Sequence, residues 1–469
     1  MEDQFAQRSS AFMSWLASIP DVTISPAIEL ADLRSLNAGR GVIALADIPA
    51  DTDLFTIPRS SILSTETSEL PKLLPDFFAE DPDAWITLTI VMIYEYLQGE
   101  KSIWKPYFDV LPTEFDTLMF WTEDELEELQ ASVVRRKIGK ELADMTINKI
   151  MIPLIKKHAK IFYPQESPKR LTDKQLLALA HRFSSTIMSY AFDLEKDSKD
   201  VEVDEEGYAS EEEDALLPKG MVPLADMLNS NASFNARLFY GPGTVTMRTT
   251  EDIKHGEEIL NDYGHLPRSD MLRRYGYITD QYKPFDIVDM PIEMILKAVQ
   301  EYRAFDEEDW DQRMKYLENK EVLDDGYMIY RKDAPPQDDD EDKKMAGEEW
   351  RMFDPLLVAL LRILLADKSL YRGKFTSEGE ERNMTLWMHV ADVCMNIAVN
   401  RSSMYKTSIE EDTKMLQDVN VQGRLRQAIE VRLGEKEILR DMLEEASELK
   451  RKYKYVAEHV RPAKRQKKA

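Results

Sequence analysis

Three short segments of the chain place glycine, amide, acidic and tyrosine residues at spacings that suit ligand binding. In Asn37-Ala-Gly-Arg-Gly41 the glycines let the backbone approach a ligand closely, although an ordinary tight turn has the same composition. Asp226 and Asn229 stand three residues apart, and an amide that donates and accepts hydrogen bonds suits a polar cofactor; capping and turn formation are the alternative. Asn261-Asp-Tyr-Gly264 is followed by Tyr275-Gly-Tyr277, for which buried core tyrosines are the alternative.

The elements that hold these segments are predicted from hydrophobic periodicity. Alternating apolar runs broken by glycine and proline predict short strands at 28–30, 41–45, 53–57, 234–240 and 244–248. The turn Gly241-Pro-Gly243 predicts a hairpin between the last two strands, and Asp51-Thr-Asp53 stands where a second hairpin would turn. A three-to-four-residue period predicts helices between about 83 and 192 and again beyond 292.

The length of 469 residues exceeds the ~250–300 residues at which a single domain usually splits. We therefore predict an N-terminal helix, a strand-containing domain with a helical insertion and an acidic disordered loop, a helical domain with a disordered insertion, and a basic tail. The predicted bounds are 1–22 for the helix, 23–287 for the first domain (insertion about 80–194, loop 195–216), 288–459 for the second (insertion about 332–347) and 460–469 for the tail.

The charge of the chain is strongly negative and unevenly spread. A net charge of −26 argues against general nucleic-acid binding and favours basic partners. Residues 195–214 contain eleven acids and two lysines, and 338–342 are five further acids; solvated loops are the alternative explanation. Residues 450–468 are basic, with the spacing of a nuclear-localisation signal or of a solubilising tail.

Cysteine content and hydropathy indicate the kind of cellular compartment in which the protein is found. The single cysteine, Cys394, excludes a disulfide framework and a cysteine-based zinc cluster, and the six histidines are too scattered to suggest a metal centre. The first residues contain no apolar signal-peptide core, and the longest apolar stretch, 352–366, is too short and too interrupted by charge to span a bilayer. We expect a soluble protein of a reducing compartment.

Taken in order, the glycine loop, the Asp226-x-x-Asn229 pair and Asn261-Asp-Tyr-Gly264 resemble the SET-domain protein-lysine methyltransferases. Ser102-Ile-Trp-Lys-Pro-Tyr-Phe-Asp-Val-Leu-Pro112 and Ser189-Tyr-Ala-Phe192 resemble segments of the branch that includes the Rubisco large-subunit methyltransferases. Within it, the segment 221–229 looks closest to SET-domain-containing protein 6 and the fungal ribosomal lysine methyltransferases. The resemblance implies an α+β fold, in which a SET-domain β-fold of small sheets with a pseudoknot and a helical insertion precedes an all-α substrate-binding domain.

The resemblance also implies S-adenosyl-L-methionine as the cofactor, no metal, and roles for individual residues. Tyr263 would be the catalytic residue. Trp104, Tyr275 and Tyr277 would contact the substrate, and a tyrosine at position 277 favours monomethylation. The residues implied in cofactor binding are Ala38, Gly39, Arg40, Tyr190, Asp226, Asn229, Ser230 and Tyr263. The family usually has histidine where this chain has Ser230, but the family contact there is through backbone atoms, so serine should be tolerated.

Charge and resemblance together predict the substrate. Fungal members of the branch methylate large-subunit ribosomal proteins, which are basic, so we expect this chain to monomethylate a lysine of such a protein. We expect it to be a monomer and to act in the nucleus, or also in the cytoplasm. We expect no direct contact with nucleic acid or membrane. Histones and other non-ribosomal proteins are alternative substrates. A non-catalytic acidic chaperone of basic proteins, which Ser230 alone supports, and a histidine methyltransferase remain open.

Overall fold

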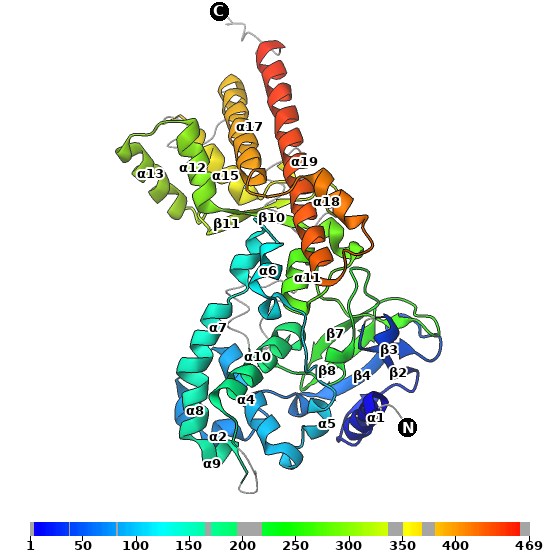
Figure 1. Ribbon diagram of the computed structural model, residues 1–469. Coiled ribbons are helices and arrows are strands. Elements are labelled where there is room, and N and C mark those ends of the chain that lie inside the picture. Colours follow the sequence, from blue (N-terminus) through cyan, green and yellow to red (C-terminus); the bar gives the residue numbers. More distant parts are fainter. Residues whose placement is uncertain are drawn as a thin grey trace, which may run out of the picture. The chain divides into compact units, whose positions relative to one another are not determined.

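The computed structural model describes residues 4–36, 38–80, 83–164, 170–194, 218–335, 350–367 and 380–459. The predicted acidic loop, most of the predicted insertion at 332–347 and the predicted basic tail lie outside these residues. The chain divides into two compact units (Figure 1). Unit 1 consists of Met1–Phe120, Ile138–His265 and Met271–Tyr277, and unit 2 of Trp121–Lys137, Leu266–Asp270 and Ile278–Ala469.

Unit 1 is built on short antiparallel strands. A four-stranded sheet has the order β1-β4-β8-β7, a three-stranded sheet the order β2-β3-β9, and β5 pairs with β6. The strands are β1 (Thr23–Ile24), β2 (Ile28–Asp32), β3 (Arg40–Ala44), β4 (Asp53–Pro58), β5 (Phe192–Asp193), β6 (Lys219–Gly220), β7 (Ala236–Gly241), β8 (Thr244–Thr249) and β9 (Glu258–Ile259). The predicted hairpin around Gly241-Pro-Gly243 is confirmed. The second predicted hairpin is wrong: the connection 45–52 is longer than a hairpin loop, and β3 and β4 belong to different sheets.

Helices surround these strands, most of them between β4 and β5, where the sequence predicts an insertion (Figure 1). The longest, α10, begins at a capping box in which the side chains of Thr172 and Gln175 each accept a hydrogen bond from the other residue's backbone N–H. Its buried stripe, which includes Leu176 and Phe183, joins the core of unit 1. The helices of unit 1 are α1 (Gln4–Ala17), α2 (Leu70–Leu73), α3 (Pro75–Ala79), α4 (Ala84–Gln98), α5 (Lys105–Phe108), α7 (Lys140–Thr146), α8 (Ile152–Lys157), α9 (Ala159–Phe162) and α10 (Asp173–Tyr190), with a π-helical turn (Ile147–Met151) before α8.

Unit 2 is largely helical, with a separate apolar core. Its helices are α6 (Glu123–Glu127), α12 (Ile292–Tyr302), α13 (Glu307–Glu318), α15 (Pro355–Leu365), α17 (Glu380–Ser402), α18 (Ile409–Leu416) and α19 (Gly423–His459), and α11 (Arg268–Tyr275) begins in unit 2 and ends in unit 1. The long helices α17 and α19 run side by side (Figure 1). The predicted all-helical composition needs one correction, because β10 (Ile287–Pro291) and β11 (Gly326–Tyr330) form a two-stranded sheet. Within the described ranges, no helix is long and apolar enough to cross a membrane.

The boundary between the units is less simple than the predicted single division at residue 287. The segment Trp121–Lys137, which lies within the predicted insertion of the first domain, belongs to unit 2. Its hydrogen bonds explain this: Arg424 Nη1 of α19 donates to Glu125 Oε2 at 2.8 Å, and Gln130 Nε2 donates to Thr407 Oγ1 at 3.0 Å. The contacts that determine its placement join residues far apart in sequence, which periodicity does not reveal.

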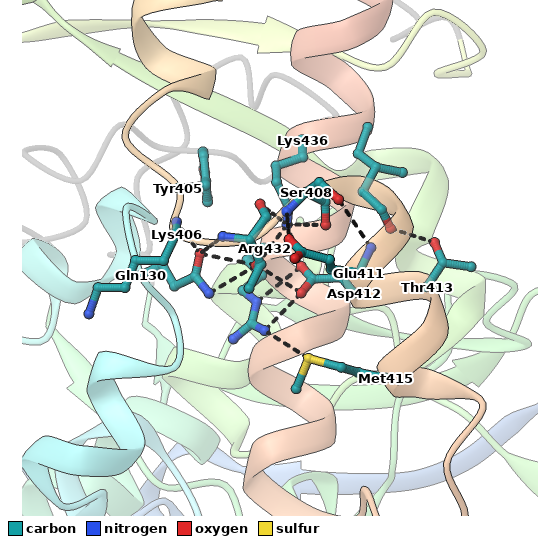
Figure 2. Close-up of polar contacts among 12 residues, drawn as sticks. Gln130, Tyr405, Lys406, Ser408, Glu411, Asp412, Thr413, Met415, Arg432 and Lys436 are labelled. Carbon is teal, nitrogen blue, oxygen red and sulfur yellow. Dashed lines mark hydrogen bonds and ion pairs between the residues drawn. The ribbon is translucent and has the colours of Figure 1, made fainter.

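A polar cluster joins this segment and α18 to α19. Its buried members are Asp412, Arg432 and Lys436 (Figure 2), and the partly exposed Glu128 and Thr407 complete it. Arg432 Nη2 lies 2.8 Å from Asp412 Oδ1, and Arg432 Nη1 donates to Glu128 Oε2 at 2.9 Å. Lys436 Nζ donates to the other oxygen of Asp412, whose side chain is fully buried. Burial alone would raise the pKa of Asp412, but the hydrogen bonds from Arg432 and Lys436 hold it below its ordinary value.

Removal of the Asp412 carboxylate should strongly destabilise unit 2. Asp412→Ala leaves two buried cations without their shared partner, and breaking such a pair typically costs about 3–5 kcal/mol. The matched control is Asp441→Ala on α19, because its pair with Arg440 is partly exposed and should contribute at most about 1 kcal/mol. Urea unfolding followed by circular dichroism measures both variants. Equal losses of unfolding free energy would contradict the prediction.

Candidate active site

Two irregular segments of unit 1 meet side by side: 226–235, before β7, and 258–263, which begins with β9. Asn261 N donates to Asn229 O at 2.8 Å, and Ser230 and Asn261 form a parallel bridge. The side chain of Asn235 bonds the backbone of the second segment as a neighbouring strand would: its Nδ2 donates to Glu258 O at 2.9 Å and its Oδ1 accepts from Leu260 N at 2.8 Å. The second and third sequence segments are therefore brought together by backbone pairing.

The glycine loop joins the same site through Asn229. Asn229 Nδ2 donates to Glu258 Oε1 at 2.7 Å and to Arg40 O at 3.2 Å, and lies 3.5 Å from Ala38 O. A Cβ atom at Gly41 would overlap Leu33 Cδ1 and would lie 2.6 Å from Glu258 Oε1 and 3.0 Å from Asn229 Nδ2, so a larger residue would require these side chains to shift. At Gly39, where φ is +65°, a Cβ atom would meet nothing within 4 Å. The loop is therefore packed tightly at Gly41 and open at Gly39.

Asp226 is a buried acid at the base of the site. It lies in the 3₁₀ turn Ala225–Met227, it is 6% exposed, and Tyr107 on α5 donates its hydroxyl hydrogen to Asp226 Oδ2. Asp226 Oδ1 is buried and has no hydrogen-bond partner among the described residues. Burial raises the pKa of Asp226 to about 7, although the Tyr107 hydroxyl and backbone N–H groups act in the opposite direction.

The three tyrosines of the third segment form one aromatic group. The rings of Tyr263 and Tyr275 are stacked with centroids 4.5 Å apart, and the centroids of Tyr275 and Tyr277 are 6.4 Å apart at an angle of 59°. The Tyr263 hydroxyl donates to Leu228 O at 3.0 Å. Burial first, and then Tyr275, Tyr277, Tyr190 and Asp226, raise the pKa of Tyr263 well above its ordinary value, so this hydroxyl stays protonated.

Gly276 sets the spacing of Tyr275 and Tyr277. Its φ is +80°, and a Cβ atom there would lie 2.7 Å from the backbone of Asp116 and Thr117. The close approach fixes the two tyrosines against the loop that follows α5. Ser189 Oγ at the end of α10 donates to Arg274 O at 2.6 Å, which also places the neighbouring Tyr190 beside this turn.

Trp104 is 2% exposed and packs on Trp15 of α1 and on Tyr107, whose hydroxyl donates to Asp226. Its predicted contact with the substrate stays a prediction. Sequence reasoning missed Tyr107, although it stands in the Trp-Lys-Pro-Tyr motif, and it missed Glu258, for which the sequence contains no comparable signal.

Comparisons with known proteins agree with this geometry. A SET-domain profile matches residues 39–264, and a Rubisco LSMT substrate-binding profile matches residues 310–439. Ribosomal lysine N-methyltransferase 4 of Saccharomyces cerevisiae is 35% identical over 347 residues, which cover 70% of this chain and 69% of the relative. N-lysine methyltransferase SETD6 of Homo sapiens is 26% identical over 452 residues, covering 90% and 88%. A crystal structure of the SET domain of LSMT bound to lysine and AdoHcy superposes with a TM-score of 0.69 at 17% identity, covering 99% of this chain and 98% of that one.

The chain therefore belongs to the SET-domain protein-lysine N-methyltransferases that carry a Rubisco LSMT-type substrate-binding domain. This confirms the predicted family, fold class and type of enzyme. The cofactor of such an enzyme is S-adenosylmethionine. The roles predicted for individual residues are consistent with the geometry and stay predictions.

The residues of the glycine loop suit this cofactor. Asn229 Nδ2 donates to protein acceptors, so the amide oxygen is the atom of this side chain that would accept a hydrogen bond from the amino group of the cofactor. The open side of Gly39 leaves room beside the backbone of Ala38 and Arg40. Within the described ranges, no group of His, Cys, Asp or Glu side chains is arranged to hold a metal ion.

Gly276→Ala should disturb the site more than an equivalent change elsewhere. The matched control is Gly243, in the β7–β8 turn, where φ is a similar +75° and a Cβ atom would meet nothing within 4 Å. Gly243→Ala should therefore lower the free energy of unfolding only by the about 1–2 kcal/mol that the left-handed conformation costs a non-glycine residue. Gly276→Ala adds a backbone clash and should lose about 1–3 kcal/mol more. Thermal unfolding measures the difference, and equal losses would contradict it.

The pKa of Asp226 predicts how stability depends on pH. Because the folded pKa of about 7 lies above the ordinary 3.8, the folded chain keeps a proton that the unfolded chain releases between these values. The free energy of unfolding should therefore fall as pH rises from about 4 to 7, by up to about 1.4 kcal/mol per unit. Asp226→Asn should flatten this fall while keeping an acceptor for Tyr107.

The control for Asp226→Asn is Asp47→Asn. The backbone N–H of His255 and the side chain of Lys254 lower the pKa of this exposed acid, so its contribution to stability has the opposite sign and is lost as pH falls. Asp47→Asn should leave the fall between pH 4 and 7 in place. Unfolding free energies measured at several pH values test both variants, and an unchanged slope in Asp226→Asn would contradict the assignment.

Proposed function

We propose that this methyltransferase monomethylates a lysine of a large-subunit ribosomal protein, and that it acts as a monomer in the nucleus. The observation that carries the proposal is the 35% identity to ribosomal lysine N-methyltransferase 4 of Saccharomyces cerevisiae. The net charge of −26 supports it, because ribosomal proteins are basic and opposite charge speeds their encounter with the enzyme. The basic segment 450–468 supports a nuclear location.

The aromatic group formed by Tyr263, Tyr275 and Tyr277 suits the side chain of a lysine. When bound, S-adenosylmethionine supplies an electrophilic methyl group on a positively charged sulfur. The lysine must enter as a neutral amine, although its ordinary pKa is ~10.4. The surroundings that raise the pKa of Tyr263 and Tyr190 also disfavour an ammonium, so they lower the pKa of an entering lysine.

Within this group, Tyr263 is the residue proposed to position the amine. Its hydroxyl is protonated and is held by Leu228 O, so its oxygen lone pairs can accept from the amine or contact the methyl group. Aromatic faces attract the methylammonium product as well as the lysine stem. A tyrosine at position 277 supports monomethylation, because a hydroxyl there would leave less room for a second methyl group than the hydrogen of a phenylalanine.

Tyr263→Phe should lose at least about 100-fold in methyl transfer, because the hydroxyl that orients the amine is gone. Incorporation of tritiated methyl groups into purified large-subunit ribosomal proteins measures this, and the mass of the product peptide counts the methyl groups. Tyr163→Phe is the matched control, since it removes a hydroxyl that accepts from Leu171 N in the same unit, away from the site. Binding of S-adenosylhomocysteine should be retained in both.

The outcomes separate the parts of the proposal. Label on one ribosomal protein that disappears in Tyr263→Phe supports the substrate and the residue. Label that survives Tyr263→Phe would overturn the role of Tyr263. Cofactor binding without label would overturn the ribosomal substrate, and basic nuclear proteins such as histones would then be tested. A product of two or three methyl groups would overturn monomethylation.

A further inference from the structure

The ring of Phe5, in the first turn of α1, contacts two arginines: Arg34, which precedes the glycine loop, and Arg40, which lies within it. The guanidinium carbon of Arg34 lies 4.0 Å from the centroid of the ring, and that of Arg40 lies 3.8 Å from it. A cation near the face of an aromatic ring is attracted by the ring's negative face. Because Arg34 precedes Gly39 and Arg40 follows it, a single side chain of α1 contacts residues on both sides of Gly39.

Arg34 is held in place from its other side. Its Nε donates to Asp32 Oδ1 at 2.9 Å, and its Nη2 donates to Asp32 Oδ2 at 2.6 Å. Hydrogen bonds from the side chain and backbone of Arg34 lower the pKa of Asp32 to about 2, so the carboxylate is ionised at neutral pH. Asp32 is the last residue of β2, and the ion pair therefore ties the start of the loop to the sheet.

Arg40 connects Phe5 to the predicted cofactor residues. Its Nε donates to Ser9 Oγ of α1 at 3.0 Å, and its Nη1 donates to Val110 O at 2.9 Å. Burial, followed by the nearby charge of Arg8, lowers the pKa of Arg40 to about 10, so the guanidinium is partly dehydrated but still charged at neutral pH. Dehydration strengthens its attraction to the ring. Its backbone carbonyl accepts from Asn229 Nδ2 at 3.2 Å.

We propose that Phe5, Arg34 and Arg40 form an N-terminal clamp that keeps the glycine loop in the conformation that binds S-adenosylmethionine. Phe5 is a positioning residue, because it acts through the two arginines. The proposal rests on the assignment of residues 38–40 to the cofactor. Glycine-containing loops have many accessible conformations, and each conformation that does not bind lowers the apparent affinity in proportion to its population.

The clamp predicts a particular pattern of binding and kinetic constants. Loss of the clamp lowers the fraction of molecules whose loop is competent to bind, so it weakens binding of S-adenosylmethionine and of S-adenosylhomocysteine by the same factor. The step of methyl transfer takes place with the loop already closed on its ligand. The KM for S-adenosylmethionine should therefore rise while kcat at saturating cofactor stays unchanged.

The test is calorimetric titration of the full chain with S-adenosylhomocysteine and S-adenosylmethionine. In Phe5→Ala and Phe5→Leu we expect Kd to rise about fivefold to tenfold for both ligands, since both changes remove the aromatic face. Phe5→Trp keeps that face and should bind within about twofold of wild type. Phe239→Ala is the matched control: Phe239 is a partly exposed phenylalanine of β7 with Arg248 at 5.3 Å, remote in sequence from the loop, and its loss should leave both affinities unchanged.

A second variant keeps the test decisive if Phe5→Ala loosens α1 as a whole. Arg34→Met removes an exposed guanidinium and leaves α1 intact. It should raise Kd by the same factor for both ligands, and by a smaller factor than Phe5→Ala does. Wild-type affinity in Phe5→Ala or in Phe5→Leu would overturn the clamp, as would a weakening that differs between the two ligands. A wild-type chain that binds neither ligand would overturn the cofactor site itself. The titration contains no protein substrate, so the identity of the substrate does not affect it.

Discussion

The site depends on the pairing of two largely irregular segments, 226–235 and 258–263. Asn261 N donates to Asn229 O, and the side chain of Asn235 takes the place of a missing strand by bonding both Glu258 O and Leu260 N. Backbone groups this close to the core need partners, and an amide side chain can donate and accept at once. This pairing sets the position of Tyr263, two residues beyond Asn261, so that its hydroxyl reaches Leu228 O. The predicted catalytic tyrosine and the predicted cofactor-binding Asn229 are thus positioned by one set of hydrogen bonds.

The same burial gives the site its electrostatic character. Around the 3₁₀ turn Ala225–Met227, loss of water raises the pKa of Asp226 and of Tyr190, which both resist ionisation. An amine that enters such surroundings is shifted in the opposite sense, toward its neutral form, because desolvation always disfavours the charged state. A dedicated strong base is therefore unnecessary for forming the nucleophile. Asp226 resists ionisation less than the tyrosines do. The hydrogen bond from Tyr107 limits how far burial can raise the pKa of Asp226.

The sequence predicts some of these features and not others, for physical reasons. The glycine loop, Asp226, Asn229 and the three tyrosines are visible because each needs a particular residue type. A Cβ atom at Gly276 would clash with backbone, and one at Gly41 would displace side chains. The β7–β8 hairpin is visible because its turn and strands are local. Glu258, the placement of 121–137 in unit 2 and the pairing of β3 with β9 depend on contacts between residues far apart in the chain. Trp104 is predicted from its motif, but its packing on Trp15 of α1 joins residues far apart in the chain, which the motif does not reveal.

Net charge affects how often a substrate meets this enzyme, and local contacts decide which side chain enters the site. A net charge of −26 attracts every basic protein, and at physiological ionic strength such attraction is screened beyond about 8 Å, so it raises the rate of encounter without selecting a lysine. Selection must come from contacts made after encounter. Tyr275 and Tyr277 are suited to this, because Gly276 fixes them against the backbone of Asp116 and Thr117 and leaves them little freedom to adapt. Apolar contact between these rings and the aliphatic stem of a lysine would depend little on ionic strength, unlike the attraction of the net charge.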